Sequence, residues 1–127
     1  METIINKSIE LFTNTISFAN DLLSMMLKKK EKKEKQTEIL KQIIYNQRCL
    51  KYVCKKNYYK EFFIDYENKI SDFLKTFFDD EMASCFIKGN IDIYWLLRYG
   101  SEIKDEIIEK SLEEFINICK SRKYNIQ

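Results

Sequence analysis

The chain contains no proline, and its two glycines stand at positions 89 and 100. Proline and glycine supply most tight turns, because one presets the backbone angle φ and the other tolerates positive φ. A β-sandwich or a doubly wound α/β fold needs many such turns, so both folds are disfavoured. Long helices suit this composition, since the two strongest helix breakers are almost missing. The first expectation is therefore an all-α protein.

Residues 3–27 have the apolar periodicity of a long helix. Steps of four and three join one stripe: Ile5, Ile9, Phe12, Ile16, Ala19, Leu23 and Met26. A second line at period seven flanks this stripe: Ile4, Leu11, Phe18 and Met25. Together the two lines predict a wide apolar face that belongs in the core of a helical bundle.

Apolar periodicity stops at residues 28–35, which are all lysine or glutamate, and resumes at Thr37. We expect 28–35 to be a lysine-rich connection, either an exposed helix end or a flexible link. Thr37 is a plausible N-cap for the next helix. The pattern loses phase again near Asn57, which predicts a break before a helix that reaches residue 79.

The second half contains both glycines and predicts shorter helices. Asp79, Asp80 and Glu81 suit a helix N-terminus, and Gly89 is a natural residue to end that helix. A further helix over 93–99, capped by Asn90 or Asp92, would end at Gly100, and Ser101 would cap the last one. The competing interpretation is a β-hairpin over 86–94.

The fold prediction is one compact all-α domain over residues 1–127, a bundle of four long helices plus one short helix. Residues 122–127 are expected to form a frayed tail. The predicted core consists of Ile5, Ile9, Phe12, Ile16, Leu23, Ile43, Leu50, Phe63, Ile70, Phe73, Phe77, Leu96, Leu112 and Phe115.

Nothing in the sequence looks like a secretory signal or a membrane span, so we expect a cytoplasmic protein. Four cysteines, at 49, 54, 85 and 119, then indicate reduced thiols rather than disulfides. Cys49 and Cys54 lack the usual spacing of a zinc knuckle, and no metal site or cofactor is expected.

Histidine is absent, which removes the commonest general base and metal ligand. Two isolated glycines cannot build a loop that binds phosphate. The carboxylates of Asp79, Asp80 and Glu81 are best interpreted as helix caps, since a metal-dependent nuclease usually places its carboxylates on strands. We therefore expect no enzymatic activity and no small-molecule substrate.

The formal net charge of +2 conceals an asymmetry. Residues 1–60 hold 13 Lys/Arg and 6 Asp/Glu, a net of +7, whereas residues 61–127 hold 9 and 14, a net of −5. Such a division either steers a charged partner or lets the two halves neutralise each other when they pack.

Basic and tyrosine residues alternate between positions 45 and 60. Cations can neutralise phosphates while aromatic rings stack on bases, so residues 28–60 suggest a nucleic-acid-binding accessory protein as the alternative function. The candidate residues are Arg48, Lys51, Tyr52, Lys55, Lys56 and Tyr59.

The leading functional hypothesis is a non-enzymatic protein-binding module, of the inhibitor, immunity, adaptor or assembly-subunit type. Its candidate binding residues are Tyr94, Trp95, Arg98 and Tyr99, because Trp, Tyr and Arg dominate the binding energy of many interfaces. The expected partner is another protein or a second copy of the chain. In the alternative interpretation Trp95 is buried in the core.

Overall fold

Five helices make up most of the computed structural model, which describes residues 2–53, 60–98 and 105–126, and their side chains except for 2, 53, 60 and 94–98. The helices are α1 (Glu2–Ser24), α2 (Lys29–Val53), α3 (Lys60–Phe77), α4 (Asp80–Arg98) and α5 (Asp105–Ser121). These described segments contain no strand, so the all-α bundle is confirmed and the hairpin over 86–94 is wrong.

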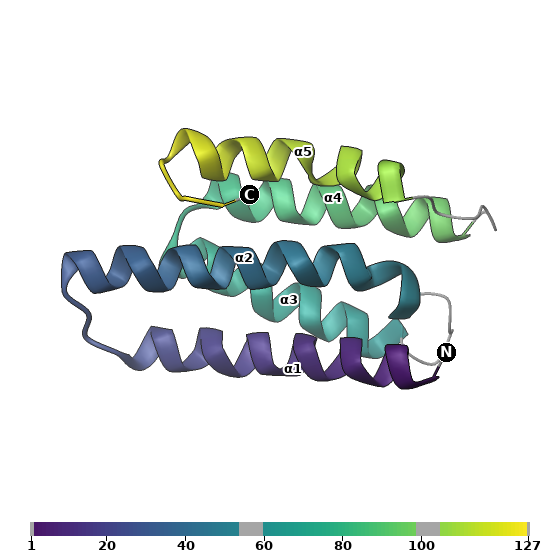
Figure 1. The fold of residues 1–127 in the computed structure, drawn as a ribbon, viewed down its shortest axis with the longest axis horizontal. Coiled ribbons are helices and arrows are strands. Elements are labelled where there is room, and N and C mark those ends of the chain that lie inside the picture. The colour runs from purple at the N-terminus through teal and green to yellow at the C-terminus, as the bar shows by residue number, and fades with distance from the viewer. Residues whose placement is uncertain (1, 54–59, 99–104, 127) are drawn as a thin grey trace.

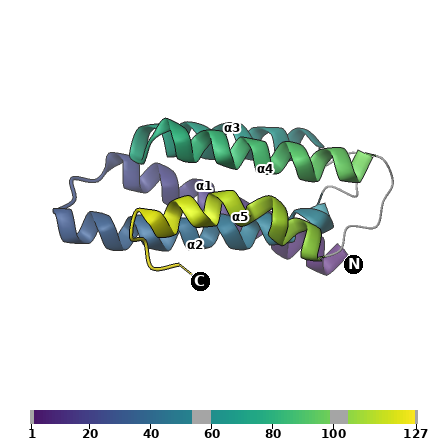
Figure 2. The same cartoon turned by 90° about the horizontal axis from the view of Figure 1, so that it is seen from above.

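The helices surround a single core in the spatial order α1, α2, α5, α4, α3, with α3 returning to α1. Figure 1 shows α1 at one edge of the bundle and the α4–α5 pair at the other, and Figure 2 shows α3 and α4 together on one side with α2 and α5 on the other. Each helix supplies a large buried side chain: Phe12, Ile43, Tyr66, Phe86 and Phe115, in helix order. The rings of Phe12 and Tyr66 are stacked with centroids 4.5 Å apart.

Part of the core is polar. Asn46 of α2 donates from Nδ2 to the Thr15 hydroxyl of α1 at 2.8 Å and to the Tyr66 hydroxyl of α3 at 3.2 Å. All three side chains are buried, and the polar partners satisfy groups that would be costly to bury alone. This cluster holds three helices in one register.

Gly89 and Asn90 lie inside α4, so the expected helix end at Gly89 is wrong. Asn90 is buried, accepts a hydrogen bond from Gln47 Nε2 and donates from Nδ2 to Glu67 Oε2 at 3.0 Å. The two segments predicted as short helices, the one that begins at Asp79–Glu81 and ends at Gly89 and the one over 93–99, therefore share one helix as far as Arg98. Residues 99–104, which include Gly100 and Ser101, lie outside the described residues.

The lysine-rich segment belongs almost entirely to α2, which begins at Lys29. The connection between α1 and α2 is only residues 25–28, and Thr37 is a helix-interior residue whose hydroxyl donates to the Lys33 carbonyl at 2.9 Å. Lysine and glutamate are good helix formers, so α2 extends beyond the part that contacts the core. The break expected near Asn57 falls on residues 54–59, outside the described residues, between α2 and α3.

The C-terminal tail packs on the bundle, which corrects the expectation that it frays. The chain reverses at Lys123, whose φ is 64°, and the Tyr124 amide donates to the Cys119 carbonyl at 3.1 Å. This pattern is a Schellman-type helix end. The Tyr124 hydroxyl then donates to Gln36 Oε1 at 3.2 Å, and Ile126 is buried.

Candidate protein-binding surface

The buried side of α1 is rotated relative to the expected stripe. Its buried residues, from Ile5 onward, are Ile5, Ser8, Phe12, Thr15, Ala19 and Leu22. The Ser8 and Thr15 hydroxyls donate to backbone carbonyls one turn earlier, at 2.9 and 2.8 Å, so both enter the core with their donors satisfied.

Several residues of the expected stripe are consequently less buried than predicted, although Ile9 and Ile16 still pack against the core. Ile9 and Ile16 are half-buried, and Leu23 and Met26 are exposed. The prediction that Leu23 is a core residue is wrong, because the rotated buried side of α1 takes in Leu22, which is 1% exposed, and leaves Leu23 beside it 44% exposed. Phe77, another predicted core residue, is half-buried, and the Leu96 side chain lies outside the described residues.

The second apolar line of α1 is largely exposed to solvent. Ile4, Leu11 and Met25 are 46%, 37% and 49% exposed, and Phe18 is half-buried. We call these four residues the α1 row. A seven-residue repeat drifts only about 20° per heptad on a straight helix, so the row follows α1 from Ile4 to Phe18 for about 21 Å, and Met25 lies directly after the end of the helix.

Beside the α1 row runs a groove between α1 and α2 with a volume of about 440 Å³. Its lining residues are Leu11, Asn14, Thr15, Lys41, Gln42, Tyr45 and Asn46. Tyr45 is 55% exposed, and Lys35 Nζ lies 5.8 Å from the centre of the Phe18 ring. The α1 row and this groove together form what we call the α1–α2 face.

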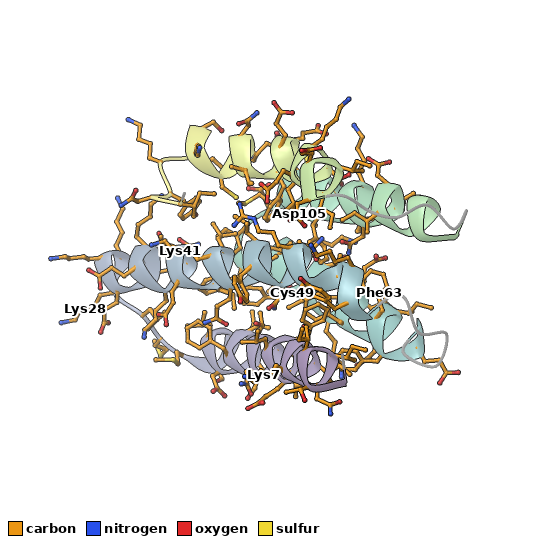
Figure 3. The ribbon with its side chains drawn as sticks, turned by 45° about the vertical axis from the view of Figure 1, so that its right-hand side comes forward. Lys7, Lys28, Lys41, Cys49, Phe63 and Asp105 are labelled. Atoms are coloured by element: carbon orange, nitrogen blue, oxygen red, sulfur yellow. The ribbon has the colours of Figure 1, made fainter. Side chains whose placement is uncertain are left out.

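Polar residues on the same side of α1 mark the face as solvent-exposed. Lys7, Asn14 and Asp21 are exposed and repeat at period seven, three residues after Ile4, Leu11 and Phe18. Figure 3 shows Lys7 on α1, at the edge of the bundle. This second period of seven was the signal in the sequence that the α1 row faces outward rather than into the core.

The residues predicted to bind a protein partner fall at the end of α4. Tyr94, Trp95 and Arg98 belong to α4, and their side chains lie outside the described residues, as does the whole of Tyr99. The two interpretations of Trp95, interface residue and core residue, both stay predictions.

The residues predicted to bind nucleic acid are partly engaged within the molecule. Arg48 pairs with Glu109 of α5 through Nε–Oε1 at 2.5 Å and Nη2–Oε2 at 3.2 Å, and Lys51 pairs with Asp105. The hydrogen bond that Lys51 Nζ donates to Asp105 raises the pKa of Lys51. Two cations of the basic half, residues 1–60, thus pair with carboxylates of the acidic half, residues 61–127.

Of the remaining nucleic-acid candidates, only Tyr52 lies among the described residues. Tyr52 is half-buried, with its ring centre 5.1 Å from Lys51 Nζ. Lys55, Lys56 and Tyr59 lie outside the described residues. The exposed lysines in the described part of residues 28–60 are Lys28, just before α2, and Lys29, Lys30, Lys32, Lys33 and Lys41 of α2.

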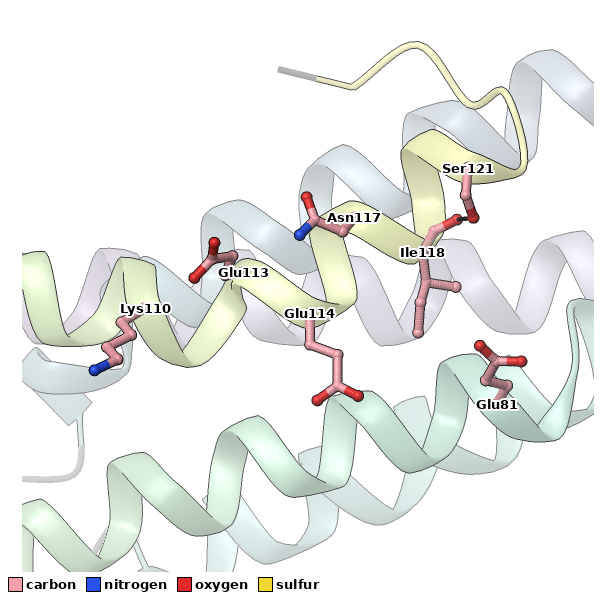
Figure 4. Close-up of a pocket in the computed structure, with 7 residues that line it drawn as sticks. All are labelled: Glu81, Lys110, Glu113, Glu114, Asn117, Ile118 and Ser121. Carbon is pink, nitrogen blue, oxygen red and sulfur yellow. Dashed lines mark hydrogen bonds between the residues drawn. The ribbon is translucent and has the colours of Figure 1, made fainter.

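A pocket of about 550 Å³ along α5 contains three glutamates, Glu81, Glu113 and Glu114 (Figure 4). Two of them already have cationic partners, because Glu81 pairs with Arg122 at 3.2 Å and Glu114 pairs with Lys88 at 3.0 Å. Among the described residues, no group of three or more His, Cys, Asp or Glu side chains could hold a metal ion.

Asp79 acts as the N-cap of α4, since its Oδ1 accepts the Met82 amide at 3.1 Å. Burial favours a higher pKa for this carboxyl group, but the bonds from Arg122 and from the Met82 amide outweigh burial and lower the pKa. The prediction that the acidic cluster provides a helix cap is confirmed at Asp79.

Three cysteines, Cys49, Cys85 and Cys119, are free thiols, and Cys54 lies outside the described residues. Burial raises the pKa of all three thiols, that of Cys119 to about 12. A raised pKa disfavours the nucleophilic thiolate at neutral pH.

No protein-family model, curated protein or solved structure matches the chain. None of the helices described here is both long enough and apolar enough to span a bilayer. The α1–α2 face combines exposed apolar side chains with a groove.

Proposed function

We propose that the chain is a non-enzymatic protein-binding module and that it binds its partner through the α1–α2 face. The observation that carries the proposal is the α1 row, in which Ile4 and Leu11 of α1 and Met25, directly after the helix, are each more than one-third exposed. Apolar side chains aligned in this way are typical of surfaces that receive another helix.

The size of the row predicts a modest affinity. Burying the exposed part of each side chain contributes roughly 1 kcal/mol, and the α1 row with Tyr45 therefore contributes about 5 kcal/mol. Association costs about 4–15 kcal/mol in lost translational and rotational freedom. The apolar contacts alone are thus insufficient, and the partner must also make polar contacts with the groove or with the charged residues beside the row.

The absence of enzymatic activity is part of the same proposal. The two cations of the α2–α5 contact and two glutamates of the α5 pocket are paired with opposite charges, and the described thiols have raised pKa values. These groups stabilise the fold, and none of them is set up as a general base or nucleophile.

The test compares Leu11→Glu with Ile64→Glu. Ile64 is on α3 and is 47% exposed, so it is a matched control away from the α1–α2 face. Each tagged variant is used to purify bound proteins from the native host, and retained proteins are identified by mass spectrometry. We expect a protein, either foreign or the chain itself, that wild type and Ile64→Glu retain and Leu11→Glu loses. Identical retained proteins for all three would contradict the proposal.

Phosphate binding through residues 28–60 is the second candidate. It is favoured by the exposed lysines at the start of α2, notably Lys28, Lys29 and Lys30. It is weakened by the ion pairs of Arg48 and Lys51 with α5, since a cation already paired has less to gain from a phosphate.

A further inference from the structure

We infer that the partner of the α1–α2 face is a second copy of this chain, with the two α1 helices antiparallel across a two-fold axis at Asn14. The inference rests on the proposed function and adds the identity and orientation of the partner. It is carried by the arrangement of charges and apolar side chains along α1.

The charged residues beside the α1 row are symmetric in position and opposite in sign. Lys7 lies seven residues before Asn14 and Asp21 lies seven residues after it. Both are exposed, and neither forms a salt bridge with any residue that the structure describes. In an antiparallel pair centred on Asn14, Lys7 faces Asp21 of the partner subunit, and the two-fold axis forms that pair twice.

A parallel pair would reverse this advantage. It would place Lys7 beside Lys7 of the partner subunit and Asp21 beside Asp21 of the partner subunit, which are both like-charge contacts. The charges of α1 therefore select the antiparallel orientation.

The apolar residues follow nearly the same symmetry. Ile4 and Met25, and likewise Leu11 and Phe18, are centred between residues 14 and 15, half a residue from the centre of the charges. Antiparallel pairing thus brings Leu11 against Phe18 of the partner subunit, and it brings Ile4 near Met25 of the partner subunit, the first residue after α1. Because the row repeats every seven residues, a partner helix inclined by about 20° follows it from Ile4 to Phe18.

Asn14 and Tyr45 complete the contact. Asn14 is exposed at the proposed axis, where its amide can hydrogen-bond the same group of the other copy, and a single asparagine at such a position fixes helix register. Tyr45 lines the groove beside Leu11, so it lies next to the position that Phe18 of the partner subunit would occupy.

The test exchanges the charges of Lys7 and Asp21. The mass of each variant in solution is measured by sedimentation at about 10 and 100 μM. We expect wild type to dimerise with increasing concentration. Lys7→Glu and Asp21→Lys should each weaken self-association about tenfold, because each turns both ion pairs into like-charge contacts. The double variant should restore self-association. A mixture of the two single variants should form a heterodimer with a lower dissociation constant than either homodimer. Circular dichroism checks that these surface variants remain folded.

Three outcomes would overturn the inference. Wild type could remain monomeric at both concentrations, Leu11→Glu could dimerise as well as wild type, or the exchanged charges could fail to restore association. A monomer that nevertheless loses a foreign protein on Leu11→Glu would overturn only the inference, because the proposed function would still hold. Ile64→Glu again serves as the control and should dimerise normally.

Discussion

The backbone carbonyl oxygen of Ser111 on α5 lies 2.9 Å from the position that a Cβ atom on Gly89 of α4 would occupy. Gly89 is buried near the middle of α4, and its missing side chain lets the two helices approach backbone to backbone. The contact partner is main chain rather than the flexible end of a side chain, so an added methyl group can be accommodated only if a helix moves.

We therefore expect Gly89→Ala to destabilise the protein. The overpacking costs about 1–3 kcal/mol, and the better helix propensity of alanine returns at most about 1 kcal/mol, which leaves a net loss of roughly 1–2 kcal/mol. Urea unfolding measures the change. Ser84→Ala, at an exposed position of the same helix, is the matched control and should leave stability unchanged or slightly higher. If Gly89→Ala and Ser84→Ala had equal free energies of unfolding, the close approach of α4 and α5 at Gly89 would not limit the size of the side chain, and the prediction would be wrong.

The role of Gly89 illustrates what sequence could not reveal. A glycine that follows an apolar helical segment ends a helix in many proteins, and that was the prediction here. The alternative role depends on the backbone of α5, some twenty residues later in the chain. No local pattern distinguishes a glycine that ends a helix from one that admits a neighbouring helix.

The α1 helix shows the same limit at its buried face. The all-α class, the helical segment and the period of seven could all be predicted, because they depend on local spacing. The burial of Ser8 and Thr15 in place of Ile9 and Ile16 could not be predicted. It depends on the Asn46 side chain of α2, which donates a hydrogen bond to Thr15. The same rotation exposes the α1 row, whose apolar spacing predicts a core face. Its outward position was signalled in the sequence only by the polar period of seven at Lys7, Asn14 and Asp21.

We predict that Asn46→Ala destabilises the protein by about 2 kcal/mol or more. The substitution removes two hydrogen bonds inside the core and leaves the Tyr66 hydroxyl with one partner fewer. Tyr66→Phe should cost about 1 kcal/mol, since Asn46 retains its bond to Thr15. In a double-mutant cycle the two losses should be less than additive. Full additivity would mean that the 3.2 Å contact contributes no stability.

The link between Asp79 and Arg122 is expected to hold the C-terminal tail in a pH-dependent way. The pKa of Asp79 is lowered in the folded state, so its stabilising contribution is present above the ordinary pKa, near pH 4, and is lost as pH falls through the folded pKa. Because both side chains are partly exposed, the contribution at pH 7 should be only about 0.2–1 kcal/mol.

Asp79→Asn tests this prediction, since asparagine retains the capping function and loses the charge. The variant should be less stable than wild type at pH 7, and the difference should shrink as the pH is lowered towards 2 in urea titrations. Asp80→Asn, on the neighbouring exposed residue, should show a smaller difference. A difference that persists at pH 2 would rule out the charge as its cause.

The thiols should differ in reactivity according to burial. Cys119 is fully buried and its pKa is raised to about 12, so at pH 8 it should react with a thiol reagent only when the protein opens. Cys49 is half-buried and should react sooner. A Cys54→Ser background removes the thiol outside the described residues. Rapid labelling of Cys119 in the absence of urea would contradict the packing of α5.

The last prediction separates the protein-binding proposal from its nucleic-acid alternative. We expect no binding of single-stranded DNA at about 50 mM salt, where phosphate contacts are strong. The reason is the α2–α5 contact, in which Glu109 and Asp105 already neutralise Arg48 and Lys51. Fluorescence anisotropy of a labelled oligonucleotide makes the measurement.

Observed binding would favour the alternative, and two triple variants would then locate it. Lys51, Lys55 and Lys56 changed to glutamine should lower the salt slope by about 2–3 if the predicted residues contact phosphates, since each contact contributes roughly 0.9. Lys28, Lys29 and Lys30 changed to glutamine should do so instead if the start of α2 is the contact surface. Because Lys51 would have to exchange Asp105 for a phosphate, we expect the second triple variant to have the larger effect.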